Sequence, residues 1–396
     1  MAEVKPEIET FAKIKVVGVG GGGGSAINRM VANGIRGVGF VAVNTDVQAL
    51  HYNKANEKIH IGKTVTKGLG AGMNPDLGKG AAEESQNEIK EALKGCDMVF
   101  VTCGLGGGTG SGASPVVAQI AKEMGALTVA VVTKPFMFEG GQRKNIADRA
   151  YAELADKVDT IITISNDKLL QVIDKKTSLL EAFKIADDVL RQGVQGIAEI
   201  ITVPGIINAD FADVKAVMSN AGSALMGIGM ATGENKAVEA AKDAINSNLL
   251  DMSIDGARGI VFTITGGPDL SMTEVSEAAK VITSAADDDA KIIFGAVIDE
   301  KMKDQIKITV VATGFDGRGK NQKSEISKAY TPNAFIVEKE IENEPMMAST
   351  SVDKNKGKFN VFKNIPVKPA LEKKAERPSN DDDDLSVPAF IRKKMG

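Results

Sequence analysis

Nearly continuous apolar runs alternate with helix-like stretches over residues 13–203. Runs unbroken by polar positions are typical of parallel strands buried on both faces of a sheet. The predicted strands are Ile14–Val19, Gly39–Asn44, Met98–Cys103, Leu127–Thr133 and Thr160–Ser165, and the predicted helices include 26–33, Glu83–Lys94, Pro115–Met124 and Asn145–Lys157. The alternation predicts an α/β domain with a parallel sheet.

A longer amphipathic helix is predicted next. Apolar side chains recur every three or four positions over 179–201, and Ser178 with Glu181 forms a capping-box pattern. Pro204 and Gly205 end the pattern. A helix of this length between two folded regions is expected to act as a spine joining two domains.

A second α/β or α+β pattern follows the long helix. Its predicted helices are Asp213–Ser219, Asn235–Ser247 and Met272–Ala285, and its predicted strands are Gly259–Thr265, Lys291–Val297 and Ile306–Ala312. The expected organisation is an N-terminal extension (1–12), a first domain (13–177), the central helix (178–203) and a second domain (204–316).

The composition changes after Gly314. Residues 317–384 mix Lys, Glu, Asn, Ser and Pro and end in four aspartates, so they are predicted to form a disordered linker. The last segment, 385–396, contains an apolar cluster followed by Arg392, Lys393 and Lys394. It is predicted to be a docking peptide, with a chance apolar cluster as the alternative.

The charge is divided unevenly along the chain. Residues 317–396 carry 16 Lys/Arg and 12 Asp/Glu, a net of +4, which leaves 32 minus 40, or −8, for residues 1–316. An acidic body argues against nucleic acid as a partner. Cys96 and Cys103 match no disulfide framework or metal-ligand spacing, and no apolar run approaches the ~18 residues of a membrane span. A cytoplasmic protein without signal peptide or direct membrane span is predicted.

The first glycine-rich turn, Gly18–Ser25, follows one predicted strand and opens a helix. Gly18, Gly20 and Gly23 match the dinucleotide fingerprint, and Asp46 near the next strand end would suit a ribose hydroxyl. An NAD-dependent oxidoreductase is therefore one hypothesis. Close packing of helix on strand is the structural alternative.

Two further glycine turns favour a nucleoside triphosphate instead. Gly104–Gly112 follows another strand, and Gly68–Pro75 adds a third turn. Glycines let successive backbone N–H groups point at one anion, and a helix N-terminus adds partial positive charge. Thr109 and Ser111 offer hydroxyls, but the lysine of the common phosphate-binding loop is missing.

Four stretches of the chain together resemble the tubulin/FtsZ family of GTPases, whose bacterial members act in cell division. They are Gly106–Gly112, Asn44–Asp46, Thr133–Gly140 and Asn208–Asp213. The similarity covers 13–316 and resumes at 387–392. It implies a tubulin-like GTPase fold with a parallel sheet, a long central helix, a second α/β domain and a disordered C-terminal tail.

The resemblance also implies the nucleotide contacts. GTP or GDP would bind to Gly21, Gly22, Gly23, Gly24, Ser25, Gly108, Thr109, Gly110, Glu139, Arg143, Asn166, Phe183 and Asp187. Mg²⁺ would bridge the β- and γ-phosphates and keep most of its waters, so no protein metal ligand is expected. Ser25 and Ser111 depart from the family pattern, which commonly has Asn and Thr there.

Specific roles follow for the base and ribose contacts. Asp187 would accept hydrogen bonds from guanine N1–H and the exocyclic amine, Phe183 would stack on the base, and Asn166 would add a contact. Glu139 and Arg143 would face the ribose and phosphates. The alternatives are core packing for Phe183, a solvated charge for Asp187, and an exposed i,i+4 ion pair for Glu139 with Arg143.

Catalysis is implied for Asp210 and Asp213, which would act on the nucleotide of a neighbouring subunit. A head-to-tail contact of this kind does not close and generates filaments, here a division ring. N-capping of a helix is the alternative role for these aspartates. The peptide 385–394 would bind an actin-like membrane tether and other division proteins. A non-catalytic scaffold of the same fold remains a rival hypothesis.

Overall fold

The computed structural model describes residues 12–172, 177–203, 205–247 and 253–315. The predicted linker, the docking peptide, Pro204 and all but the last residue of the N-terminal extension lie outside these residues. Within them the strands are β1 (Ile14–Val19), β2 (Val38–Asn44), β3 (Glu57–His60), β4 (Met98–Gly104), β5 (Leu127–Lys134), β6 (Thr160–Ser165), β7 (Gly222–Thr232), β8 (Ala257–Gly266), β9 (Ala286–Ile298) and β10 (Gln305–Thr313).

These ten strands form one sheet in the order β3-β2-β1-β4-β5-β6-β7-β10-β8-β9. The strands from β3 to β7 are parallel neighbours, and β10 pairs antiparallel with both β7 and β8. The two predicted α/β regions therefore share a sheet, joined where Thr160–Ile162 pairs with Gly222–Ala224. The fold is mixed α/β with a mostly parallel sheet, as predicted.

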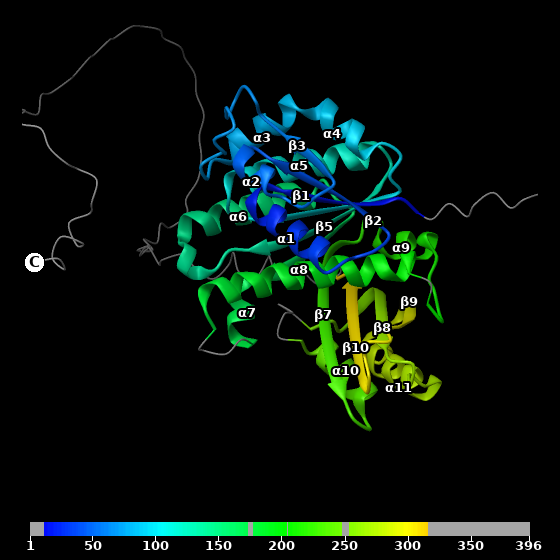
Figure 1. Cartoon of the computed structure of the whole chain (residues 1–396). Helices are drawn as coiled ribbons and strands as arrows, with labels where there is room; N and C mark the ends of the chain where they lie inside the picture. Colours follow the sequence, from blue (N-terminus) through cyan, green and yellow to red (C-terminus); the bar gives the residue numbers. More distant parts are fainter. Residues whose placement is uncertain (1–11, 173–176, 204, 248–252, 316–396) are drawn as a thin grey trace, which may run out of the picture. The chain divides into compact units, whose positions relative to one another are not determined.

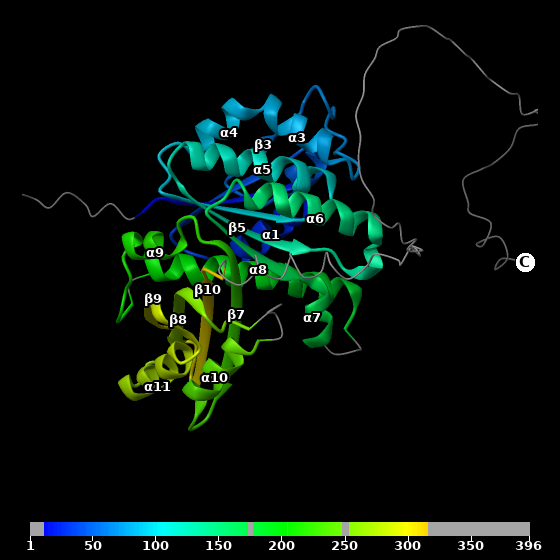
Figure 2. The same cartoon turned by 180° about the vertical axis from the view of Figure 1, so that it is seen from behind.

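The helices cover both faces of this sheet (Figures 1 and 2). They are α1 (Gly20–Ala32), α2 (Val47–His51), α3 (Pro75–Glu84), α4 (Gln86–Leu93), α5 (Gly108–Glu123), α6 (Gly141–Ala155), α7 (Asn166–Val172), α8 (Leu179–Thr202), α9 (Phe211–Met218), α10 (Lys236–Ile245) and α11 (Met272–Thr283), with a 3-10 turn η1 (Met137–Glu139).

Neighbouring residues of each parallel strand enter different cores. Val16 packs with Ile27 of α1 and Val194 of α8, whereas Val17 packs on the other face with Val117 of α5 and Leu154 of α6. Burial on both faces explains the unbroken apolar runs. A third core lies between β7–β10 and the helices α10 and α11.

The central helix matches its prediction closely. Ser178 caps α8 by accepting a hydrogen bond from Glu181 N, and the Glu181 carboxylate accepts one from Ser178 N, so the capping box is formed. The buried face of α8 contributes to the same core as β7 and β8 residues Ala224 and Val261. This helix thus packs on both halves of the sheet.

Three helices differ from their predicted bounds: two begin earlier and one is divided into two. Helices α1 and α5 already start within their glycine turns, at Gly20 and Gly108, so Pro115 lies inside α5 instead of in its first turn. Close packing explains the early start of α5, since a Cβ on Gly112 would lie 1.9 Å from Pro75 O. The predicted helix Glu83–Lys94 is two helices, α3 and α4, divided at Ser85.

Strand β7 was not predicted. Its glycines and methionines lack the β-branched signal of a strand, but packing against α10 requires the glycines. A Cβ on Gly227 would lie 1.9 Å from Ala244 O, and one on Gly229 would lie 2.0 Å from Ala240 O. Small residues in α10 and glycines in β7 let the helix lie directly on the strand.

Candidate functional site

The glycine turns meet at the point where the sheet order reverses. Strands β1 and β4 are neighbours, with Val19 opposite Cys103, and their connections leave in opposite directions, β1 toward β2 and β4 toward β5. Ligands of open parallel sheets bind in the crevice at the carboxyl ends of strands at such a switch point. Helices α1 and α5 start there, so two helix N-termini point at one place.

Several glycines are required for these two helices to meet. Gly20 has φ +71°, and a Cβ on it would lie 2.8 Å from Gly110 N. A Cβ on Gly110 would lie 2.8 Å from Gly104 O. A side chain at Gly20 would push the two N-termini apart, and one at Gly110 would push the start of α5 away from the end of β4.

Gly21 and Gly107 are different, because a Cβ on either would meet no atom within 4 Å. Both line a cavity of about 340 Å³ that opens between the two turns. The fold therefore gives no reason for glycine at these two positions. A ligand that approaches the backbone closely would supply one.

The cavity joins most of the residues predicted to contact nucleotide. Its lining includes Gly21, Gly22, Gly108, Thr109, Gly110, Glu139, Arg143, Asn166, Phe183 and Asp187. The wall is completed by residues for which no nucleotide contact was predicted, namely Leu105, Thr133, Pro135, Ala186 and Leu190, together with Val19, Gly104 and Gly107. Ala186 and Leu190 share a helix face with Phe183, a spacing that the sequence does contain.

The remaining predicted residues lie beside this cavity. Gly24 and Ser25 line a smaller cavity of about 80 Å³ together with Asn28, and Gly21 borders both cavities. Gly23 lines neither of these two, and a Cβ on it would lie 2.4 Å from Thr102 O. Gly23 therefore allows α1 to pack closely on the sheet.

The two hydroxyls of the second glycine turn have different surroundings. Thr109 lines the cavity and its Oγ1 lies 2.6 Å from Thr45 Oγ1. Ser111 is 1% exposed and its Oγ accepts a hydrogen bond from Gly106 N at 2.9 Å. The Ser111 hydroxyl thus stabilises the glycine turn by an internal hydrogen bond, whereas it was expected to contact phosphate.

Glu139 and Arg143 form the ion pair that was the alternative to a nucleotide contact, at 2.6 Å, and both line the cavity. They do not share a helix, because Glu139 ends η1 and Arg143 belongs to α6. Glu139 also accepts a hydrogen bond from Phe136 N at 3.0 Å. The pair fixes a carboxylate and a guanidinium beside the glycine turns.

Asn166, Phe183 and Asp187 line the same cavity from α7 and α8. Asn166 is 6% exposed and its Oδ1 has no hydrogen-bond partner among the described residues. The Phe183 ring is 40% exposed and packs edge-on against Phe136. A half-exposed ring beside unpaired polar groups is unusual for a core position and suits a planar polar ligand.

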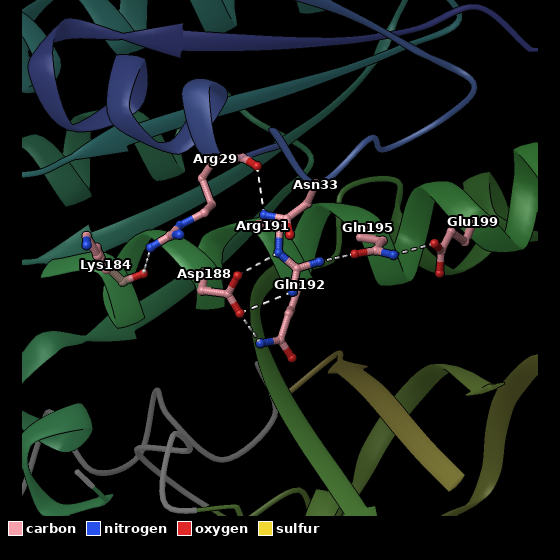
Figure 3. A network of polar contacts seen from close by, with 8 residues as sticks. All are labelled: Arg29, Asn33, Lys184, Asp188, Arg191, Gln192, Gln195 and Glu199. Atoms are coloured by element: carbon pink, nitrogen blue, oxygen red, sulfur yellow. Dashed lines mark hydrogen bonds and ion pairs between the residues drawn. The ribbon is translucent and has the colours of Figure 1, made fainter. Parts of the chain in front are cut away.

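Burial raises the pKa of Asp187 to about 6, against a lowering by the charge of Arg29 and a further rise from Asp188. No donor among the described residues hydrogen-bonds to the Asp187 carboxylate. Figure 3 shows Arg29 crossing from α1 to α8, where its Nη2 donates to Lys184 O at 3.1 Å. Arg29 was not predicted, since its role depends on the packing of α1 against α8.

Asp188 belongs to a polar chain along α8 (Figure 3). Its carboxylate accepts from Arg191 Nε at 2.7 Å and from Gln192 Nε2 at 2.7 Å. Burial alone would raise the pKa of Asp188, but these hydrogen bonds and the Arg191 charge hold it below its ordinary value. Further side-chain hydrogen bonds link Arg191 to Gln195 and Gln195 to Glu199.

Asp210 and Asp213 lie outside the cavity. Asp210 is the N-cap of α9 and its Oδ1 accepts from Asp213 N at 2.7 Å, so the capping role is confirmed for Asp210. Both side chains are exposed. Asp46 likewise caps a helix, accepting from Ala49 N at 3.0 Å.

In the described part of the chain, no group of three or more His, Cys, Asp and Glu side chains is arranged to hold a metal ion. No helix among the described residues has the length and apolarity needed to cross a membrane.

Comparison with known proteins follows the same division of the chain. The model of the Tubulin/FtsZ family, GTPase domain, matches residues 13–174, and that of the FtsZ family, C-terminal domain, matches residues 222–316. An empty FtsZ dimer from M. jannaschii is 50% identical, with a TM-score of 0.76, covering 78% of this chain and 90% of that chain.

More distant structures share the fold. CetZ2 from Haloferax volcanii, a GTPγS-bound protofilament, is 22% identical with a TM-score of 0.66, covering 81% of this chain and 100% of that chain. CetZ1 from the same organism, a GDP-bound monomer, is 20% identical with a TM-score of 0.67, covering 78% and 97%. Together with the geometry of the cavity, the family matches and the 50% identity lead to one conclusion: the chain is a GTPase that belongs to the tubulin/FtsZ family, on its FtsZ branch.

Proposed function

We propose that the chain binds GTP in the cavity between α1, α5 and α8, polymerises head to tail, and hydrolyses GTP at the junction between subunits. The backbone N–H groups at the starts of α1 and α5 hold the phosphates, because both N-termini carry partial positive charge. Gly21 and Gly107 leave room for the phosphates to approach.

The base binds at the Asp187 end of the cavity. An ionised carboxylate accepts two hydrogen bonds, which guanine supplies from N1–H and its amine and adenine does not. Asp187 is supported in this role because no described donor already occupies it. Phe183 offers a ring for stacking, and the unpaired Asn166 Oδ1 is available for a further polar contact. Glu139 and Arg143 lie between base and phosphates and serve the ribose.

A Mg²⁺ ion bound with the nucleotide would supply positive charge against the phosphates and would be held mainly by phosphate oxygens and water. The residues of the cavity contribute hydrogen-bond donors and the Arg143 charge to the same phosphates. No protein ligand to the metal is proposed.

Hydrolysis requires a correctly placed water and charge stabilisation more than covalent chemistry. The cavity lining contains one carboxylate near the ribose and one near the base, but none of its residues is a free acid beside the phosphates. Asp210 and Asp213 are exposed, and neither lines this cavity. We assign them to the nucleotide of the next subunit, where they orient the attacking water.

The observation that carries this proposal is the separation of the cavity from the two exposed aspartates within one chain. A site divided in this way becomes complete only when subunits stack, and a heterologous contact propagates into a filament. Hydrolysis is then coupled to assembly. The cellular role that we propose is a cytoplasmic division ring, with 13–177 binding GTP, 204–316 supplying the polymerisation contact, and residues 385–394 binding division proteins and an actin-like membrane tether.

A combined assay tests the proposal. Sedimentation and phosphate release are followed together with GTP, GDP and ATP over a range of protein concentrations. We expect polymer with GTP only, and a specific rate of phosphate release that rises with protein concentration. Phosphate release at full rate far below the concentration that gives polymer would overturn catalysis at a junction.

A further inference from the structure

Thr45, in the turn after β2, and Thr109, at the start of α5, are in direct contact through their buried side-chain hydroxyls. Their Oγ1 atoms lie 2.6 Å apart, and either could be the donor. Thr45 is 0% exposed and is absent from the cavity wall, whereas Thr109 lines the cavity. Thr45 thus contacts a residue of the cavity wall without lining the cavity itself.

The direction of this hydrogen bond follows from counting protons. A threonine hydroxyl has one proton to donate and two lone pairs to accept. In the described part of the chain, Thr109 is the one partner of the Thr45 hydroxyl. If Thr109 donated, the Thr45 proton would be buried without an acceptor, which is costly. If Thr45 donates, the Thr109 proton is free to turn into the cavity.

We infer that Thr45 is a positioning residue of the phosphate site, whose hydroxyl donates to Thr109 and so directs the Thr109 proton to a phosphate oxygen. The inference rests on the proposed nucleotide site. A phosphate oxygen in the cavity then completes a chain in which every hydroxyl proton has an acceptor. Charge-assisted hydrogen bonds of this kind are stronger than neutral ones.

The backbone of Thr45 is held independently of its side chain. Its carbonyl oxygen accepts a hydrogen bond from Gly70 N at 3.3 Å. Replacing the Thr45 hydroxyl by a methyl group leaves this contact in place. The substitution Thr45→Val therefore removes the proposed donor with little change in shape.

The test compares the affinity of wild type, Thr45→Val, Thr109→Val and the double variant for GTP and for guanosine, which has no phosphate. We expect Thr45→Val to weaken GTP binding by about tenfold, because the Thr109 hydroxyl is no longer held in place and its hydrogen bond to the charged phosphate becomes poorly directed. Guanosine binding, followed by ligand-observed NMR, should stay unchanged. The double variant should bind GTP no more weakly than Thr109→Val, because Thr45 acts through Thr109.

Conservative and remote variants complete the design. Thr45→Ser retains the hydroxyl and should restore GTP affinity. Thr160→Val removes another fully buried hydroxyl, which donates to Met218 O at 2.5 Å away from the cavity, and should bind GTP as wild type does. If Thr45→Val does not fold, Thr45→Ala removes the same hydroxyl without placing a methyl group against Thr109.

Three results would overturn the inference: unchanged GTP affinity in Thr45→Val, equal loss of GTP and guanosine affinity, or additive losses in the double variant. Failure of the proposed function looks different. In that case wild type itself would show no preference for GTP over ATP, whatever the Thr45 variants do.

Discussion

Asp187 and Asp188 are neighbours on α8 with opposite electrostatic surroundings. The Asp188 carboxylate accepts hydrogen bonds from Arg191 and Gln192, while no described donor reaches that of Asp187. The pKa of Asp188 is accordingly held below its ordinary value and that of Asp187 is raised to about 6. Only Asp187 lines the cavity. The unsatisfied carboxylate is thus the one placed to meet a ligand.

This difference predicts how GTP affinity depends on pH. Guanine donors favour the ionised Asp187, so binding lowers its pKa below the free value of about 6 and releases a proton when pH is below that value. Affinity should be constant well above pH 6 and fall as pH decreases through 6, approaching tenfold per pH unit. Calorimetric titration in buffers of different ionisation enthalpy would measure both the affinity and the proton release.

Two variants separate Asp187 from other titrating groups, including the phosphates of GTP. Asp187→Asn should lose guanine preference and show only the pH dependence contributed by the phosphates. Arg29→Met removes a charge that lowers the Asp187 pKa, so the fall in affinity should begin at a higher pH. A wild-type affinity with the same pH profile as Asp187→Asn would contradict the role of the carboxylate.

Gly107 should matter for the ligand and not for the fold. An added Cβ meets nothing within 4 Å, yet it would project at the cavity wall. We expect Gly107→Ala to keep the wild-type melting temperature and to lose GTP affinity by at least about tenfold, because phosphate could no longer approach the backbone. Gly80→Ala is the matched control, since Gly80 in α3 also has open space and lies outside this cavity. It should bind GTP normally.

Asp210 combines a capping role with the proposed catalytic one, and two substitutions separate them. Asn caps helices as well as Asp does, so Asp210→Asn should leave the free energy of unfolding unchanged while phosphate release is lost. Asp210→Ala should in addition lower the stability by about 1 kcal/mol. Full GTPase activity in Asp210→Asn would reduce this residue to a helix cap.

Gly229 is the residue for which a purely structural effect is predicted. A Cβ there would lie 2.0 Å from Ala240 O, so α10 would have to move away from β7. Gly229→Ala should lower the free energy of unfolding by about 3 kcal/mol, the upper end of overpacking effects. Chemical denaturation measures it. In Gly80→Ala the same substitution should raise stability by roughly 0.5–1 kcal/mol, because alanine favours a helix.

The sequence predicted the parts of the fold in which local pattern and tertiary packing agree. The apolar runs of β1, β2, β4, β5 and β6 are buried on both faces, and the Ser178 capping box forms as its spacing indicates. Strand β7 was not predicted because glycine has low β propensity. Its glycines are required instead for the close packing of α10 on the strand. Helices α1 and α5 started early because glycine, usually read as a loop residue, here allows close packing.

The sequence predicted most residues of the nucleotide site, but not how these residues are positioned by contacts between distant elements. Glycine spacing indicated phosphate binding, and the family resemblance supplied Asp187 and Glu139. Arg29 and Thr45 could not be found, since each acts across two elements that are distant in sequence. Ser111 was expected to face the ligand, yet its hydroxyl accepts from Gly106 N inside the turn.

The central claim, a site completed by the neighbouring subunit, is tested most directly by mixing two inactive variants. Asp187→Ala keeps Asp210 and Asp213 but binds GTP too weakly to be occupied at the nucleotide concentration used, and Asp213→Ala binds GTP normally but lacks one of the two acids. At a mixed junction, GTP bound to Asp213→Ala meets an intact Asp210 and Asp213 from its neighbour. We predict phosphate release that neither variant shows alone and that is greatest near equal amounts. No release at any mixing ratio, with mixed polymers demonstrated by co-sedimentation, would contradict catalysis between subunits.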